Sequence, residues 1–223
     1  MKRRSLSRLV LAALSALALA QAHAAPLDDA ISDVAHQWAK ANYETPDANK
    51  SAAFDAVIAS ARQVATTYPN HAEPLVWEAI ALSSAAKAQG GFGALRKARE
   101  ARDLLLSAEA IDPTVINGAV YTSLGSLYAN VPGWPIGFGD KKKARDYLEK
   151  AIAIAPNNID SNYFYADFLS NQGDYADAAA YAQRSLEAPP RPGREDADAG
   201  RRQEAQALLA TLKSKHGDKI SGN

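Results

Sequence analysis

The chain of 223 residues contains no cysteine. It therefore has no disulfide bonds and no N-terminal cysteine that could carry a lipid, so its stability must come from packing. Long apolar runs are also scarce. The run over 9–20, interrupted only by Ser15, spans 12 residues, whereas a helix that crosses a bilayer needs about 20. The sequence thus predicts no stable insertion into a membrane.

Positive charge is concentrated ahead of this apolar run. Lys2, Arg3, Arg4 and Arg8 precede it, and the small-x-small sequence Ala22-His23-Ala24 follows it. This order is typical of a secretory signal peptide. We therefore predict a leader over 1–24, cleaved after Ala24, and a periplasmic or secreted protein. Arg3-Arg4 leaves the twin-arginine route open beside ordinary Sec export, which Ser7 favours because the former expects a large apolar residue there.

The remaining chain lacks an excess of basic residues. The leader contains four of the 25 basic residues and none of the 25 acidic ones, so the other 199 residues have a formal net charge of −4. A nucleic-acid-binding domain is usually basic, and the sequence therefore predicts no nucleic-acid partner. The 199 residues suffice for one compact domain.

Residues for catalysis or metal binding are few and scattered. Outside the leader, the histidines are His36, His71 and His216, and none has the neighbours of a metal site. No serine lies in a G-x-S-x-G motif. The glycines of VPGWPIGFGDKKKA (131–144) match neither the P-loop nor the dinucleotide pattern. We expect no catalytic residue, no metal and no cofactor, and interpret the chain as a protein that is not an enzyme.

An internal repeat is the strongest positive signal. Tyr121-Thr-Ser-Leu124-Gly125-Ser-Leu-Tyr128, followed by Ala144, Leu148, Ala151 and Pro156, resembles the opening and closing segments of a tetratricopeptide (TPR) repeat, with tyrosine in place of tryptophan. Small residues at Gly125 and Ala144 allow two antiparallel helices to approach closely. A proline ends the second helix, because it lacks a donor and clashes with the preceding turn.

The pattern recurs in two further units. One has Trp77, Ala81, Ala101 and Pro113, and the other has Ala166, Ala178 and Pro190. In all three units the first alanine of the close lies 12 residues before the proline. We predict an all-α, TPR-like solenoid of helical hairpins, with about four helix pairs and a C-terminal capping helix. Its parts would be a degenerate pair over 25–70, three TPR-like units over 71–192, the capping helix over 193–215 and a flexible tail over 216–223.

The first two of these three units are longer than the third by seven or eight residues. Each extra stretch contains the sequence Gly-Phe-Gly, at 91–93 in the first and at 137–139 in the second. We predict an enlarged loop between the helices of each unit, around 88–98 and 131–139. Equivalent loops of a solenoid project from the same edge, so the two should be neighbours. Asp140 should cap the helix that follows.

Residues 117–190 resemble a known family. TPR-like pairs enlarged by a Pro/Gly loop that ends in Gly139-Asp140, before a Lys-x-x-Ala helix, are similar to the periplasmic T component of TRAP transporters and to the related microtubule-dynamics-regulator TPR family. The resemblance implies a secreted helical protein that docks a substrate-binding protein and can hold a small ligand. The family typically has paired glycines where this chain has Gly137-Phe138-Gly139.

Aromatic residues are the best candidates for binding. They are Trp134 and Phe138 in the second loop, Phe92 in the first, and Phe164, which is additional to the packing position filled by Tyr165. Trp134 either anchors its loop to the core or contacts a partner. We interpret the chain as a non-catalytic scaffold that binds a protein or peptide. The alternative is a periplasmic ligand-binding or transporter-accessory protein like the T component, with loop aromatics closing a pocket.

Overall fold

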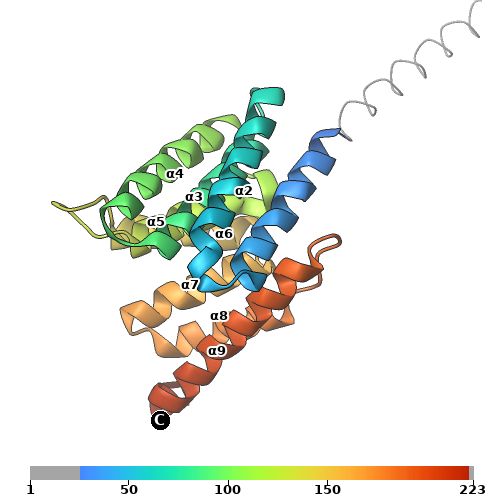
Figure 1. The fold of residues 1–223 in the computed structure, drawn as a ribbon. Helices are drawn as coiled ribbons and strands as arrows, with labels where there is room; N and C mark the ends of the chain where they lie inside the picture. Colours follow the sequence, from blue (N-terminus) through green and yellow to red (C-terminus); the bar gives the residue numbers. More distant parts are fainter. Residues whose placement is uncertain (1–25, 221–223) are drawn as a thin grey trace, which may run out of the picture.

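The computed structural model describes residues 26–220, except for the side chain of Phe92. The predicted leader over 1–24 lies outside this range, as do residue 25 and residues 221–223. The described chain is all-α and its successive helices pack as adjacent pairs (Figure 1). The predicted fold class, a TPR-like helical solenoid, is therefore confirmed.

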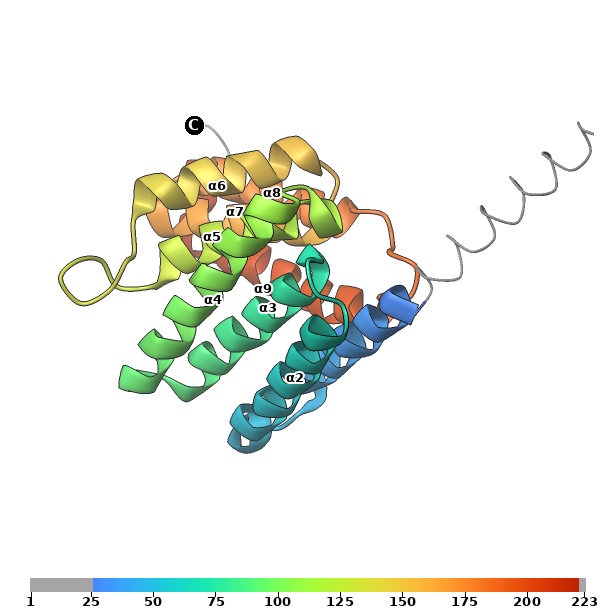
Figure 2. The same ribbon diagram turned by 90° about the horizontal axis from the view of Figure 1, so that it is seen from above.

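The helices follow one another with short connections. A first helix over 26–39 continues into the π-helical turn η1 (Lys40–Glu44), followed by α2 (Asp47–Thr67), α3 (Ala72–Gln89), α4 (Gly91–Ile111), α5 (Val115–Asn130), α6 (Lys141–Ile154), α7 (Ile159–Gln172), α8 (Tyr175–Glu187) and α9 (Glu195–Ile220). The hairpins α3–α4, α5–α6 and α7–α8 correspond to the three units found in the sequence (Figure 2).

Local sequence explains where several of these helices begin and end. The carboxylate of Asp140 accepts the backbone N–H groups of Lys142 and Lys143 at 2.9 and 3.1 Å, and it caps α6 as predicted. Asn158 caps α7 in the same way. Gly173 ends α7 at a φ of 89°, a left-handed conformation that glycine adopts without strain. Pro113, Pro156 and Pro190 follow the ends of α4, α6 and α8.

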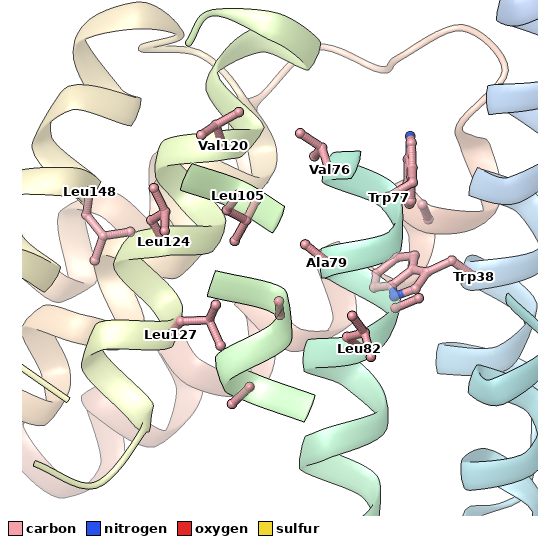
Figure 3. Packing of buried hydrophobic residues seen from close by; sticks show 14 of the residues in the cluster. Trp38, Val76, Trp77, Ala79, Leu82, Leu105, Val120, Leu124, Leu127 and Leu148 are labelled. Carbon is pink, nitrogen blue, oxygen red and sulfur yellow. The ribbon is translucent and has the colours of Figure 1, made fainter. Parts of the chain in front are cut away.

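Small residues set the spacing within the hairpins. In the α5–α6 pair, a Cβ atom at Gly125 would lie 2.5 Å from Leu148 Cγ and 3.2 Å from the carbonyl oxygen of Ala144. Leu124 and Leu148 are fully buried and face each other across the same contact (Figure 3). Of the remaining repeat positions, Trp77, Ala81, Ala101, Tyr128, Ala144, Ala151, Ala166 and Ala178 are buried, and Tyr121 is partly buried.

The structure corrects the expectation of a loop around 88–98. Helices α3 and α4 are joined through Gly90 alone, and Gly90 and Gly91 have φ values of 64° and 66°. The extra residues instead lengthen the two helices, to 18 and 21 residues, compared with 14 and 13 in α7 and α8. Two left-handed glycines are enough to reverse the chain, and the flanking Ala, Leu, Arg and Lys residues are good helix formers. The second insertion does form a loop, over 131–140.

The end of the chain also differs from expectation. Helix α9 starts close to the predicted position but continues past a kink at His216 as far as Ile220. The His216 ring stacks on the Tyr175 ring, and Lys219 Nζ lies 5.1 Å from the centre of the same ring. Residues 216–220, which we expected to be a flexible tail, are therefore helical and packed against α8.

The first and last helices meet. The hydroxyl of Tyr43 donates to Glu204 at 3.2 Å, and His36 Nδ1 lies 2.8 Å from Asp196 Oδ2. Tyr43 also packs so closely on α9 that a Cβ at Gly200 would lie 2.4 Å from its ring. Helix α9 packs on α7 and α8 as well. The concave side of the solenoid is thus closed by contacts between segments about 160 residues apart.

Replacing Gly125 by valine should destabilise the fold, because the added carbons would collide with Leu148 and with the backbone of α6. Overpacking of this kind costs roughly 1–3 kcal/mol of unfolding free energy. Urea denaturation followed by circular dichroism should show a lower midpoint with an unchanged slope.

Gly217→Val is the matched control, since a Cβ there would meet nothing within 4 Å. Its unfolding free energy should change by less than about 0.5 kcal/mol. Equal stabilities of the two variants would show that close approach at Gly125 is not required.

Candidate functional site

A pocket with a volume of about 130 Å³ lies on the inner side of the solenoid. Its walls come from Trp38 in the first helix, from the first helices of the three hairpins (α3, α5 and α7), and from the segment that leads into α9 and its first turns. The second helices of the hairpins contribute none of its lining residues. The pocket therefore depends on the closure of the solenoid by α9.

Two indoles form one wall. The rings of Trp38 and Trp77 have centres 6.2 Å apart, and Trp38 Nε1 donates to Ser84 Oγ at 2.9 Å. Trp77 is only 2% exposed, and its Nε1 has no hydrogen-bond partner within the described chain. Figure 3 shows the Trp77 nitrogen turned away from Trp38. A buried N–H group without an acceptor lowers the stability of a fold, so an acceptor for the Trp77 N–H would be stabilising.

Three arginines also line the pocket, and two of them share one carboxylate. Arg191 Nη1 and Arg201 Nε each lie 2.7 Å from an oxygen of Asp160, in the first turn of α7. Burial raises the pKa of Asp160, but the charges of Arg201 and Arg191 lower it more, and the carboxyl stays ionised well below its usual range. Asp198 pairs with Arg191, and Glu204 pairs with Arg201. These three carboxylates exceed the two arginines by one negative charge, and the charges of Asp160 and Asp198 also act on the neighbouring Arg194.

The third arginine is not paired. The guanidinium of Arg194 lies 4.9 Å from the centre of the Trp77 ring, and its buried Nε has no hydrogen-bond partner. Among the described residues Arg194 has no ion pair. Burial lowers its pKa and the neighbouring Arg191 lowers it further, yet arginine stays protonated at physiological pH. A cation held on an indole face in this way is stabilised by the ring.

The backbone is strained at the edge of the pocket. Ile116 and Asn117, which line it, have φ values of 50° and 52°, and Gly118 continues the left-handed turn at 77°. A left-handed conformation costs roughly 1–2 kcal/mol for a residue with a Cβ atom. Such residues cluster at functional sites, and this turn places Ile116 on the pocket wall.

The structure separates the aromatic residues that the sequence singled out. Phe164 lines the pocket, where its ring lies 4.6 Å from the Arg201 guanidinium. Trp134 lies outside the pocket and is 90% exposed on the loop over 131–140. Phe138 anchors that loop, with its ring 5.6 Å from the Tyr128 ring and 4.6 Å from the Arg102 guanidinium. The side chain of Phe92 lies outside the described part of the chain.

Trp77 and the arginines were not among the site residues expected from the sequence. Trp77 was assigned only as a repeat position, and residues 193–215 were predicted only as a capping helix. The sequence does contain a signal, because the segment over 191–202 has four arginines in twelve residues. Asp160, the partner of Arg191 and Arg201, lies 31 and 41 residues from them in the chain, which hid the cluster.

Within residues 26–220, no group of histidine, aspartate and glutamate side chains could hold a metal ion. The helices of this range also include none that is long and apolar enough to span a membrane.

The comparisons with known proteins agree with the fold. A family model described as Tetratricopeptide repeat matches residues 136–194, from the loop before α6 to the segment that precedes α9. The chain therefore carries a TPR repeat within an all-helical structure, as the sequence predicted. No curated protein matches the chain.

Replacing Asp160 by asparagine should cost roughly 3 kcal/mol or more, because it leaves the arginines, among them the almost fully buried Arg201, without their shared counter-charge. The folded-state pKa of Asp160 is depressed, so its stabilisation is present above the unfolded value of 3.8 and is lost as the pH falls toward the folded-state pKa. Denaturant titrations should therefore show the full difference at neutral pH and a shrinking one below about pH 3.8.

Asp55→Asn serves as the control. It breaks a 2.7 Å pair with Lys97 whose carboxylate is 58% exposed, and it should cost less than about 1 kcal/mol. A similar cost for both variants, or no dependence on acid, would contradict the role assigned to Asp160.

Proposed function

We propose that this protein is a non-catalytic scaffold of the TPR type that binds a protein or peptide partner, and that it acts outside the cytoplasm. Support for partner binding comes from the TPR repeat over 136–194, since TPR domains generally mediate protein–protein interactions. Solenoid proteins present extended concave surfaces for this purpose.

The main support for this proposal is the inner face of the solenoid, the side on which the pocket lies. The first helices of the three hairpins face it together and expose hydroxyl, amide and aromatic groups there, including Ser123, Asn117 and Phe164. Such a mixture suits a peptide backbone and its side chains better than it suits a purely apolar ligand. The loop over 131–140 offers a second candidate surface, where Trp134 and Ile136 are 90% and 65% exposed. Exposed apolar residues on a fixed loop are typical of recognition surfaces.

The proposal of export is based on the predicted signal peptide over 1–24. Lys2, Arg3, Arg4 and Arg8, the apolar run over 9–20 and Ala22-His23-Ala24 form the three parts of a signal peptide in the right order.

A second candidate function is binding of a small ligand, as in a periplasmic binding or transporter-accessory protein resembling the TRAP T component. The pocket of about 130 Å³ favours it, because indoles and an unpaired arginine meet there.

Photo-crosslinking in living cells tests the scaffold function. A photoreactive residue at Ser123 in the pocket wall, or at Trp134 on the loop, should yield a covalent adduct with one defined protein, identified by mass spectrometry. The same residue at Asp146, exposed on α6 and outside the pocket, is the matched control and should yield none.

Adducts at Asp146 alone would contradict use of the inner face. No adduct at any position, together with a small molecule that stays bound to the purified protein in native mass spectrometry, would favour the second candidate.

Export is tested by N-terminal sequencing of the protein recovered from the periplasmic fraction. The mature chain should begin at Ala25, because signal peptidase needs small residues before the cleaved bond. Ala24→Arg should block cleavage, whereas Ala25→Ser, one residue further on, should be processed normally. Full-length chain that starts at Met1 and stays in the cytoplasm would exclude export.

A further inference from the structure

We propose that the loop over 131–140 docks on a lipid surface with anionic headgroups. Trp134 and Ile136 lie at the lipid boundary, and the cations beside them lie against the headgroups. The contact is peripheral, because the loop rests on the surface and does not cross it. The proposal goes beyond the scaffold function, since it gives the loop a partner other than a protein.

The tip of the loop is apolar and projects from the solenoid. Trp134, Pro135 and Ile136 are consecutive and exposed, and the Trp134 side chain is 90% exposed. The loop extends away from α5 and α6, the two helices that it joins (Figures 1 and 2). A projecting apolar tip fits a flat lipid boundary, where tryptophan is enriched because its ring is apolar and its N–H group is polar.

The backbone of the loop forms most of its hydrogen bonds within the chain. Two of its ten residues, Pro132 and Pro135, have no N–H group, and five of the other eight N–H groups donate to carbonyls of this chain. Ile136 and Gly137, for example, both donate to the Gly133 carbonyl, at 3.2 and 3.1 Å. Backbone groups that approach lipid need such internal partners. A loop that recognised a peptide through its backbone would leave these donors free.

Cations flank the tip on both sides. Arg99 of α4 places a guanidinium nitrogen 3.5 Å from the carbonyl oxygen of Ile136, and Arg96 is exposed one turn earlier in the same helix. On the other side, the three lysines at 141–143 follow the loop directly and are all exposed. Anionic lipids attract basic side chains that lie near the membrane surface.

The acidic residues nearby do not neutralise these five cations. Across 91–103 and 131–146 the chain has eight basic and four acidic residues, a local formal charge of +4, whereas the 199 residues after the leader total −4. Ion pairs involve three of these basic residues and two of the acidic ones: Lys97, Arg102, Arg145, Glu100 and Asp103. Within the described chain the five cations form no ion pair, and only the carboxylates of Asp140 and Asp146 remain to offset them.

The lysines at 141–143 stand where a helix disfavours cations. They form the first turn of α6, which contains no acidic residue, although the N-terminal end of a helix dipole is positive and favours acidic side chains. Helix stability therefore does not explain three lysines there, and departures from a local rule are expected at functional sites. A layer of anionic headgroups beside the loop supplies the missing counter-charge.

Vesicle binding tests the proposal. The chain from Ala25 onward is used, because the apolar run over 9–20 would itself bind lipid. Vesicles of equal parts phosphatidylglycerol and phosphatidylcholine should sediment with the protein and shift its tryptophan emission to shorter wavelengths. The shift reports Trp134, since Trp38 and Trp77 are already buried, at 7% and 2% exposure. Vesicles of phosphatidylcholine alone should bind at least tenfold more weakly, and salt should weaken binding to the mixture.

Variants separate the apolar contribution from the charged one. Trp134→Ala should raise the Kd for the mixed vesicles about tenfold or more, because a large side chain no longer leaves water. Lys141→Gln combined with Lys142→Gln should raise it about fivefold for each charge removed. Lys213→Gln combined with Lys215→Gln makes the same change of charge at exposed positions on α9, and is the matched control whose Kd should stay within about twofold.

Isoleucine variants provide a second matched pair. Ile136→Ala should raise the Kd a few-fold, because less apolar surface leaves water. Ile111→Ala makes the same change at a 47% exposed isoleucine at the end of α4, and should leave the Kd unchanged.

The proposal is overturned if the mixed vesicles cause neither sedimentation nor an emission shift at millimolar lipid. Equal binding to phosphatidylcholine alone, or equal binding by Trp134→Ala, would also overturn it. A photoreactive residue at position 134 should yield lipid adducts on the mixed vesicles. Protein adducts at this position in cells, without vesicle binding, would assign the loop to a protein partner instead.

These outcomes are distinguishable from those of the scaffold function. Vesicle binding without protein adducts at Ser123 would support the lipid contact and remove partner binding on the inner face. Adducts at Ser123 without vesicle binding would leave the scaffold function intact and remove only the lipid contact.

Discussion

The shared carboxylate of Asp160 is the interaction on which the concave site depends. In a solenoid each helical pair contacts its neighbours, and α9 is the unit that follows the α7–α8 hairpin. Here Asp160, at the start of α7, pairs with Arg191 before α9 and with Arg201 inside it. Two cations around one anion offset the cost of burying it, since an isolated buried charge is far more expensive. Because Arg191 and Arg201 are fixed in this way, Arg194 between them is held over Trp77.

The repeat was predictable because its signal is local and periodic. Three residues reflect constraints within one hairpin. Gly125 allows the helices to approach closely, Ala144 is the small residue that it faces, and Pro156 ends the second helix. The arginine cluster was not predictable by the same route, because Asp160 and its two arginines lie on successive units and Arg194 meets Trp77 only when the chain curls back on itself. No periodic pattern links Asp160 to Arg201, or Tyr43 to Glu204. The pocket depends on contacts between the two ends of the chain, whereas the helices depend on the local sequence.

The two Gly-Phe-Gly segments show why similar sequences gave different structures. The second lies behind Pro132 and Pro135, each of which lacks a backbone donor and has a fixed φ. A helix cannot continue through that spacing, and the residues up to Asp140 form a loop. The first contains no proline, and its glycines are followed by Ala94, Leu95 and the basic residues after them, which favour a helix. The prolines, which only the second segment has, therefore decide the structure more than the shared glycines and phenylalanine do.

The loop and the pocket, separate in the prediction, are connected through α5. Ser126 and Leu127, which line the pocket, lie in the last turns of this helix, and the loop begins directly after Asn130. The loop is also fastened from the other side, since the Arg102 guanidinium covers the Phe138 ring of the loop. Trp134 is therefore held in the open on a supported loop next to one end of the pocket. Helix α5 thus connects the two, because its last turns line the pocket and the loop starts at its end.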